Sequence, residues 1–135
     1  MEFKVHHIAV SVSDMGKAVE FYSILGFKEI AGYKDDNLEI KHLYLNGFIL
    51  ELFCFKEHIG KELLELWEDL KRIGVKHFAL SVPDIHKAKK YLSDEGIIQE
   101  DIEIKKGRTG ILYFFIKDPD GNFVEIVEDK RNIKL

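Results

Sequence analysis

Two histidines and two glutamates recur at matching places in the two halves of this 135-residue sequence. His7 lies in VHHIAVSVSD and His77 lies in VKHFALSVPD. Glu51 in FILELF and Glu125 in FVEIV are single acidic residues within apolar runs, where a carboxylate is costly to bury unless it is paired or binds a cation. Two imidazoles and two carboxylates, with water completing the sphere, suit a borderline divalent ion such as Ni²⁺, Zn²⁺, Co²⁺, Mn²⁺ or Fe²⁺. The pattern predicts one metal ion shared by His7, Glu51, His77 and Glu125.

These residues belong to an internal repeat. Seventy residues separate His7 from His77, and the same offset relates two further pairs, Asp14 with Asp84 and Gly26 with Gly96. A constant offset at three landmarks indicates two copies of one supersecondary unit. The two glutamates are 74 residues apart, close to this period, so we interpret them as equivalent positions.

Each copy opens with a strand that has two unlike faces. In residues 5–12, alternation places Ile8, Val10 and Val12 on one face, and His7, Ala9 and Ser11 on the other. The second copy repeats this pattern over residues 77–82. The apolar face is expected to pack on helices, whereas the face with a histidine and two small residues leaves room for a ligand.

The rest of each copy predicts one helix and three more strands. Asp14 and Asp84 are suitable helix N-caps, and Gly26 and Gly96 suit the helix ends. The turns Asn46-Gly47 and Asp118–Gly121 predict two hairpins, over residues 42–55 and 111–127, and weaker strands are expected at 28–34 and 97–104. Residues 58–74 predict an amphipathic linking helix. The expected fold is therefore α+β, with two βαβββ repeats (about 3–57 and about 75–130) in a single domain of residues 1–135.

Composition narrows the class of protein. The chain is 46% hydrophobic and 33% charged, as in folded globular proteins. A net charge of −4 and a pI of about 5.9 predict no nucleic-acid or membrane partner, and no apolar run approaches the length of a membrane span. The single cysteine, Cys54, excludes an internal disulfide and is typical of a reducing compartment. We expect a cytoplasmic protein.

The remaining histidines are weaker candidates for metal ligands. His6 adjoins His7, but the repeat aligns His7 with His77 and places Lys76 opposite His6. We therefore interpret His6 as a structural residue or a support for His7. The other three histidines have no equivalent in the second repeat and are expected at the surface: His42, His58 and His86.

From HHIAVSVSDMGKAVEFY through FILELF and HFALSVPD to DPDGNFVEI, the sequence resembles the vicinal oxygen chelate superfamily, most of all glyoxalase I (lactoylglutathione lyase). The resemblance implies paired βαβββ modules around a cupped mixed sheet. It also implies a divalent metal ion at His7, Glu51, His77 and Glu125, with nickel or zinc first and cobalt, manganese or iron as alternatives. The metal would bind the two oxygens of an enediolate. Glu125 would be the catalytic base and Glu51 a second catalytic residue. A homodimer acting on a small-molecule substrate is also implied.

One departure concerns the thiol part of the substrate. Glyoxalase I of this type has an arginine after the first helix that binds a carboxylate of glutathione, and the matching position here is Ala31 in GFKEIAGY. Lys28 and Lys34 flank it without matching it. A basic segment, Lys105, Lys106 and Arg108, precedes the second hairpin and is a candidate for binding an anionic group. Whether glutathione is used stays open.

Other reactions of the same superfamily also stay open. The first half resembles methylmalonyl-CoA epimerase, which runs similar enolate chemistry. GRTGILYFFIKDPDGN resembles the last strands of Fe²⁺ or Mn²⁺ ring-cleaving dioxygenases, which need only two histidines and one glutamate. Thiol transferases that modify fosfomycin are a further relative. A drug-sequestering binding protein of this fold is a different class, but such proteins generally lack the four ligands.

Overall fold

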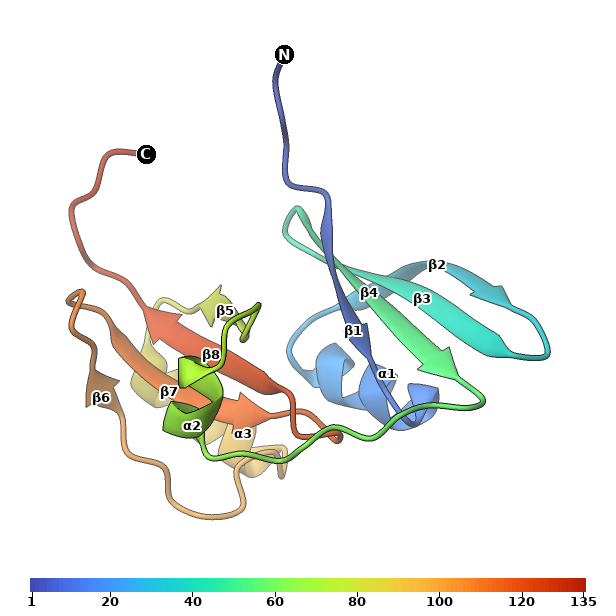
Figure 1. Ribbon diagram of the computed structural model, residues 1–135. Helices are drawn as coiled ribbons and strands as arrows, with labels where there is room; N and C mark the ends of the chain where they lie inside the picture. The colour runs from blue at the N-terminus through green and yellow to red at the C-terminus, as the bar shows by residue number, and fades with distance from the viewer. The chain divides into compact units, whose positions relative to one another are not determined.

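The computed structural model describes residues 1–135 and divides them into two compact units, Met1–Glu62 and Leu63–Leu135. Each unit contains one four-stranded mixed sheet (Figure 1). Each also follows the order β-α-β-β-β, with one extra helix at the start of the second unit. The predicted α+β class and the two repeats are thus confirmed. No helix in the chain is both long and apolar enough to cross a bilayer.

The first unit consists of β1 (His7–Ser11), α1 (Met15–Ile24), β2 (Lys28–Lys34), β3 (Leu38–Leu45) and β4 (Phe48–Phe55). Its strands lie in the order β1-β4-β3-β2, with β1 parallel to β4 and the other neighbours antiparallel. Asn46 and Gly47 both have positive φ, 47° and 87°, as the predicted tight turn between β3 and β4 requires.

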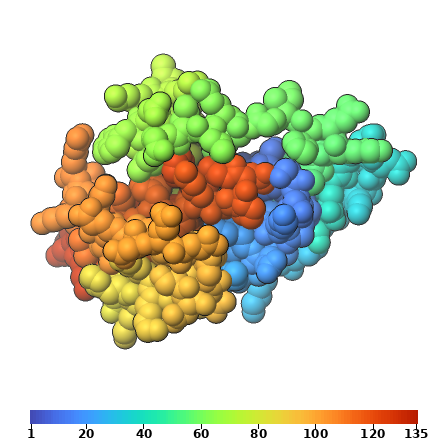
Figure 2. Space-filling view, turned by 90° about the horizontal axis from the view of Figure 1, so that it is seen from below, coloured from blue at the N-terminus to red at the C-terminus, as the bar shows by residue number.

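The second unit consists of α2 (Leu66–Lys71), β5 (Phe78–Ser81), α3 (Ile85–Asp94), β6 (Lys105–Lys106), β7 (Leu112–Lys117) and β8 (Phe123–Glu128). Its strand order, β5-β8-β7-β6, repeats that of the first unit, and β5 is again parallel to β8. Figures 1 and 2 agree that α2 and α3 lie on opposite sides of β8.

The helices begin where the predicted caps stand. Asp14 accepts a hydrogen bond from the backbone N–H of Lys17, and Asp84 accepts two, from His86 and Lys87. The bond from Lys87 is the main cause that lowers the pKa of Asp84. Because these carboxylates satisfy backbone donors that the helix leaves free, each helix starts at a fixed residue.

Alternation along the central strands separates core from site. Leu50 and Leu52 of β4 are fully buried on the side where β4 contacts α1, and Glu51 between them faces the other way. Val124 and Ile126 of β8 are buried likewise, on the side that contacts α3. Each sheet therefore has one face covered by its helix and one face that carries the glutamate.

Two predicted elements are wrong in extent. Residues 97–104 form no strand, because the backbone N–H groups of Ile97 and Ile98 bond to the carbonyl of Leu92 and close the end of α3. The short strand β6, just after this range, is the segment that pairs with β7. The helix expected over 58–74 is confined to α2, since glycines at both ends of that range disfavour helix, and short helices are marginal in water.

The turn before β8 is held by a buried carboxylate. Asp118 is only 4% exposed and accepts hydrogen bonds from the backbone N–H groups of Asp120 and Asn122 and from the side-chain amide of Asn122. The N–H of Gly121 bonds to the carbonyl of Asp118, which confirms the predicted turn. This turn sets where β8 begins and hence the position of Glu125.

We expect Asp118→Ala to lower the free energy of unfolding by about 2–3 kcal/mol, because three donors lose their acceptor and each net hydrogen bond contributes about 1 kcal/mol. Urea unfolding followed by circular dichroism measures the change. Asp36→Ala, at an exposed aspartate, is the control and should change stability by less than about 0.5 kcal/mol. Equal effects of the two substitutions would contradict this account of the turn.

Candidate functional site

The first unit brings His7 and Glu51 together on the open face of its sheet. His7 is the first residue of β1, and Glu51 lies on the neighbouring strand β4. His7 Nε2 is 3.4 Å from Glu51 Oε1. The other ring nitrogen of His7, Nδ1, is 2.9 Å from Nδ1 of His6. His6 therefore supports the ring of His7, in line with the supporting role expected for it, and leaves Nε2 directed at the carboxylate.

His42 also lies at this site, so its predicted surface role is wrong. Its Nε2 is 2.6 Å from Glu51 Oε2, and its ring stacks on that of His7 with the centroids 6.1 Å apart. The strand register explains the contact, since His42 of β3 is directly opposite Glu51 of β4. Counting outward from the Asn46-Gly47 turn places His42 opposite Glu51, so this contact could have been predicted from the sequence.

The second unit brings His77 and Glu125 together in the same way. His77 Nε2 is 2.9 Å from Glu125 Oε2. Both side chains are largely shielded, with exposures of 21% and 14%. The other ring nitrogen, His77 Nδ1, is buried without a hydrogen-bond partner. Because an ionised carboxylate only accepts hydrogen bonds, His77 donates to Glu125 from Nε2.

The two units differ in what stands opposite the glutamate. Phe115 of β7 faces Glu125 in the register, at the place that His42 holds opposite Glu51. The Phe115 ring contacts the His77 ring edge-on, with the centroids 4.8 Å apart. Glu51 therefore lies between two imidazoles, whereas Glu125 has one imidazole and an apolar neighbour.

Both pairs fit one half of a metal centre. Two nitrogen or oxygen ligands, each about 2.1 Å from a metal and roughly at a right or tetrahedral angle, lie about 3.0–3.4 Å apart. The imidazole-to-carboxylate separations of 3.4 and 2.9 Å are close to this range. No three His, Cys, Asp or Glu side chains are already arranged to hold a metal ion. Each unit thus offers a pair of ligands and not a complete sphere.

The second pair lines a cavity of about 330 Å³ within its own unit. Aromatic and apolar side chains of α2, β7 and the segment between β6 and β7 form most of its wall. Two cationic side chains, Lys106 and Arg108, also line it, whereas Lys105 does not. Part of the basic segment singled out in the sequence therefore lies beside His77 and Glu125.

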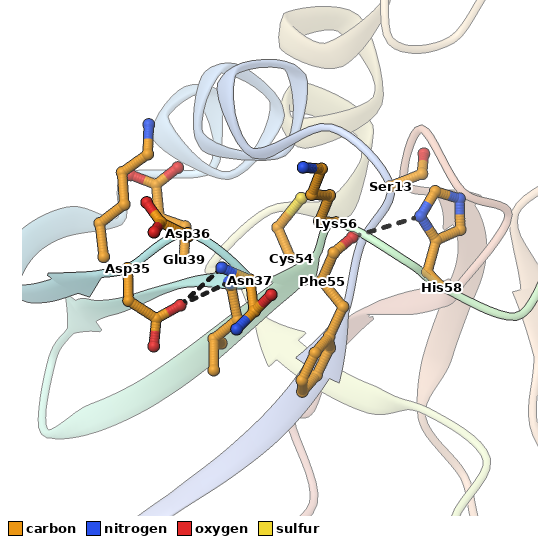
Figure 3. Close-up of a pocket in the computed structure, with 11 residues that line it drawn as sticks. Ser13, Asp35, Asp36, Asn37, Glu39, Cys54, Phe55, Lys56 and His58 are labelled. Carbon is orange, nitrogen blue, oxygen red and sulfur yellow. Dashed lines mark hydrogen bonds between the residues drawn. The ribbon is translucent and has the colours of Figure 1, made fainter.

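A cavity of about 310 Å³ in the first unit is a structural feature of a turn (Figure 3). Asp35 there accepts hydrogen bonds from the backbone N–H groups of Asn37 and Leu38 and from the hydroxyl of Tyr33. These bonds, led by that from Asn37, lower the pKa of Asp35. His58 Nδ1 is 3.4 Å from the carbonyl oxygen of Phe55. Because the Asp35 carboxylate already accepts hydrogen bonds from the chain itself, we do not regard this cavity as the candidate functional site.

Ala31, which the sequence analysis matched with the glutathione-binding arginine, lies in β2 opposite His42. The three residues Ala31, His42 and Glu51 thus follow one another across β2, β3 and β4. His86, as predicted, is exposed.

The comparisons with known proteins agree with this architecture. The model of the Glyoxalase/Bleomycin resistance protein/Dioxygenase superfamily matches residues 4–126. The chain belongs to this superfamily. A crystal structure of a glyoxalase family protein from Enterococcus faecalis superimposes with a TM-score of 0.77 at 26% identity, covering 93% of this chain and 97% of that one.

Two relatives show how far the family likeness extends. The uncharacterized protein YwkD of Bacillus subtilis is 33% identical over 128 residues, covering 92% of this chain and 95% of YwkD. A probable lactoylglutathione lyase of Synechocystis is 31% identical over 133 residues, covering 90% of this chain and 92% of the lyase. Both relatives align over nearly their whole length.

We expect both His42 and His77 to be protonated on Nε2 in the metal-free protein, because each donates to a carboxylate from that atom. Long-range ¹H–¹⁵N NMR at pH 9, where a free imidazole is neutral, distinguishes the two tautomers. Exposed His86 serves as the reference for a ring without such a partner. Protonation of His77 on Nδ1 would contradict the pairing with Glu125.

Proposed function

We propose that the chain is a metal-dependent lyase of the glyoxalase I type, with one divalent ion held by His7, Glu51, His77 and Glu125. The observation that carries the proposal is the same His–Glu pair in both units, on the face of each sheet that lies opposite α1 or α3. Nickel or zinc is our first expectation, because imidazole and carboxylate together suit a borderline ion. The likeness to the Synechocystis probable lactoylglutathione lyase supports the reaction class.

A complete ligand set needs both pairs. Each unit supplies one imidazole and one carboxylate, so the first unit has to meet a second unit, within one chain or across a homodimer. A bound divalent ion would supply Lewis acidity, which stabilises negative charge on the oxygens of a carbonyl substrate.

Glu125 is the side chain best placed to move a proton. Glu51 has a hydrogen bond from His42 and lies beside His7, which hold its two oxygens. Glu125 has only the contact from His77, and its opposite neighbour is Phe115, which donates nothing. A carboxylate oxygen without a competing donor can accept a proton from a substrate carbon. We assign the transfer to Glu125 and a fixed ligand role to Glu51.

The reaction that this pair supports is a proton shift between adjacent carbons. Glu125 takes the proton from the carbon that bears the hydroxyl and returns it to the neighbouring carbonyl carbon. The hydroxyl proton moves to the former carbonyl oxygen, so that a hemithioacetal becomes a hydroxyacyl thioester with no net loss or gain of protons. The apolar wall beside Glu125, with Tyr113 and Phe115, limits the access of water to the carboxylate. The thiol need not be glutathione, because Ala31 provides no cation for its carboxylate.

Substitution of the glutamates tests the ligand set. Both Glu51→Gln and Glu125→Gln should weaken Ni²⁺ or Zn²⁺ binding by more than about 100-fold, since even residues behind metal ligands contribute about 10- to 100-fold. Isothermal titration and elemental mass spectrometry measure affinity and loading. Glu39→Gln, which lies on the opposite face of the first sheet, is the matched control and should bind normally. Unchanged binding in either site variant would remove that glutamate from the centre.

Turnover tests the base. With metal in excess, Glu125→Gln should lower kcat for methylglyoxal hemithioacetals by about 10²- to 10⁴-fold, the range for general-base catalysis. Glutathione and small thiols such as cysteine serve as alternative partners in the assay. A metal-loaded protein without activity on any hemithioacetal, but with exchange of the α-proton of an acyl-CoA ester, would instead support the epimerase-like reaction.

A further inference from the structure

We infer that the cavity of the second unit binds the anionic group of a small substrate through Arg108 and Lys106, with an apolar part of the same molecule against Trp67. This inference deepens the proposed function, on which it rests for the reacting end of the substrate at His77 and Glu125. It assigns the substrate to one chemical class, small apolar or aromatic carboxylates and phosphates.

Helix α2 lies against the face of the sheet that carries Glu125. Figures 1 and 2 place α2 on the side of β8 opposite α3, which is the side that carries Glu125. Trp67 and Leu70 of α2 line the cavity together with His77 and Glu125. Trp67 is 56% exposed, although aromatic side chains of this size usually bury most of their surface. Trp67 therefore lines the cavity of the His–Glu pair and still has more than half of its surface uncovered.

The two cations that line the cavity are not neutralised by a carboxylate of the chain. Lys106 and Arg108 have no carboxylate partner, whereas other lysines of this unit do: Lys76 pairs with Asp69, Lys89 with Asp101, and Lys90 with Asp94. The Arg108 guanidinium carbon lies 5.7 Å from the centre of the Trp67 ring. This cation–π contact positions the guanidinium and leaves its N–H groups free to donate.

Arg108 belongs to a turn that is closed by hydrogen bonds. The N–H of Gly107 bonds to the carbonyl of Ile111 at 2.7 Å, and the N–H of Gly110 bonds to that of Gly107 at 3.0 Å. Arg131 bonds to the Thr109 carbonyl and is itself held by Asp129. The Arg131 side chain lowers the pKa of Asp129 to about 2, so this support persists throughout the neutral and weakly acidic range. The turn therefore presents Arg108 in a defined place.

Size and charge then define the ligand. A volume of about 330 Å³ is at the lower end of the range for small-molecule sites. An arginine fork with free N–H groups matches the two oxygens of a carboxylate or phosphate. Glu125 is the acidic side chain that faces the cavity, so the anionic group should bind at the Arg108 end and the reacting carbons should lie at the Glu125 end.

The test uses the fluorescence of Trp67, the only tryptophan in the chain. The full-length protein is titrated with phenyl phosphate, benzoate and the neutral benzyl alcohol, and isothermal titration provides a second readout of each Kd. Phenyl phosphate or benzoate should bind at least about tenfold more tightly than benzyl alcohol, as expected for a hydrogen bond to a charged group. The comparison of the two acids shows which anion the site prefers.

Variants assign the effect to residues. Arg108→Gln and Lys106→Gln should each weaken binding of the preferred anion by about tenfold and leave benzyl alcohol unaffected. Lys105→Gln is the matched control, because Lys105 precedes Lys106 in β6, carries the same charge and does not line the cavity. Its Kd should stay within about twofold. Thermal unfolding of each variant checks that the fold is retained.

Three results would overturn the inference: equal affinity for benzyl alcohol and the anions, equal weakening by Lys105→Gln and Arg108→Gln, or no binding of either anion. These results are independent of the proposed reaction. Selective anion binding without turnover of any hemithioacetal would leave the anion site in place and remove the lyase activity. Turnover of a hemithioacetal without selective anion binding would support the lyase activity and remove the anion site.

Discussion

The structure depends on the register in which the outer strand of each sheet pairs with its neighbour. In β1–β4 and in β5–β8, this pairing sets a glutamate beside an alanine on the open face, while the residues on either side of that glutamate are buried. A slip of β1 by one residue would exchange the two faces of that strand, so that His7 would leave the side of Glu51 and Ile8 would take its place. Because the core and the site are opposite faces of the same strands, packing of the core fixes the His–Glu pairs.

A repeated fold need not carry two equal halves. The glutamates occupy matching places, but the residue opposite each one is His42 in the first unit and Phe115 in the second. An imidazole donor fixes one carboxylate, and an aromatic ring leaves the other with a free oxygen. In our proposal, the first module therefore supplies Glu51 as a fixed metal ligand, and the second supplies Glu125 for proton transfer. The basic and aromatic cavity adds a further difference, because Trp67 and Arg108 belong only to the second unit.

Much of this could be predicted from local rules. The caps at Asp14 and Asp84, the tight turn at Asn46-Gly47 and the alternation around Glu51 each depend on neighbours in sequence, and the structure confirms them. The contact of His42 with Glu51 was predictable from the hairpin register, but the repeat offers no histidine equivalent to His42, so the comparison of the two halves did not reveal it. The contact of Arg108 with Trp67 was not predictable, because no periodic pattern relates a turn to a helix far away in the chain. The strand expected near Ile97 failed because the end of α3 takes its N–H groups.

The central claim is that the two His–Glu pairs bind one ion together. X-ray absorption spectroscopy of the protein loaded with one equivalent of Ni²⁺ per chain, combined with the stoichiometry of saturation, tests it most directly. The account predicts saturation at one ion per chain and two imidazoles in a sphere otherwise made of oxygen. Saturation at two ions per chain, each with a single imidazole, would contradict it and would show that the two units act as separate sites.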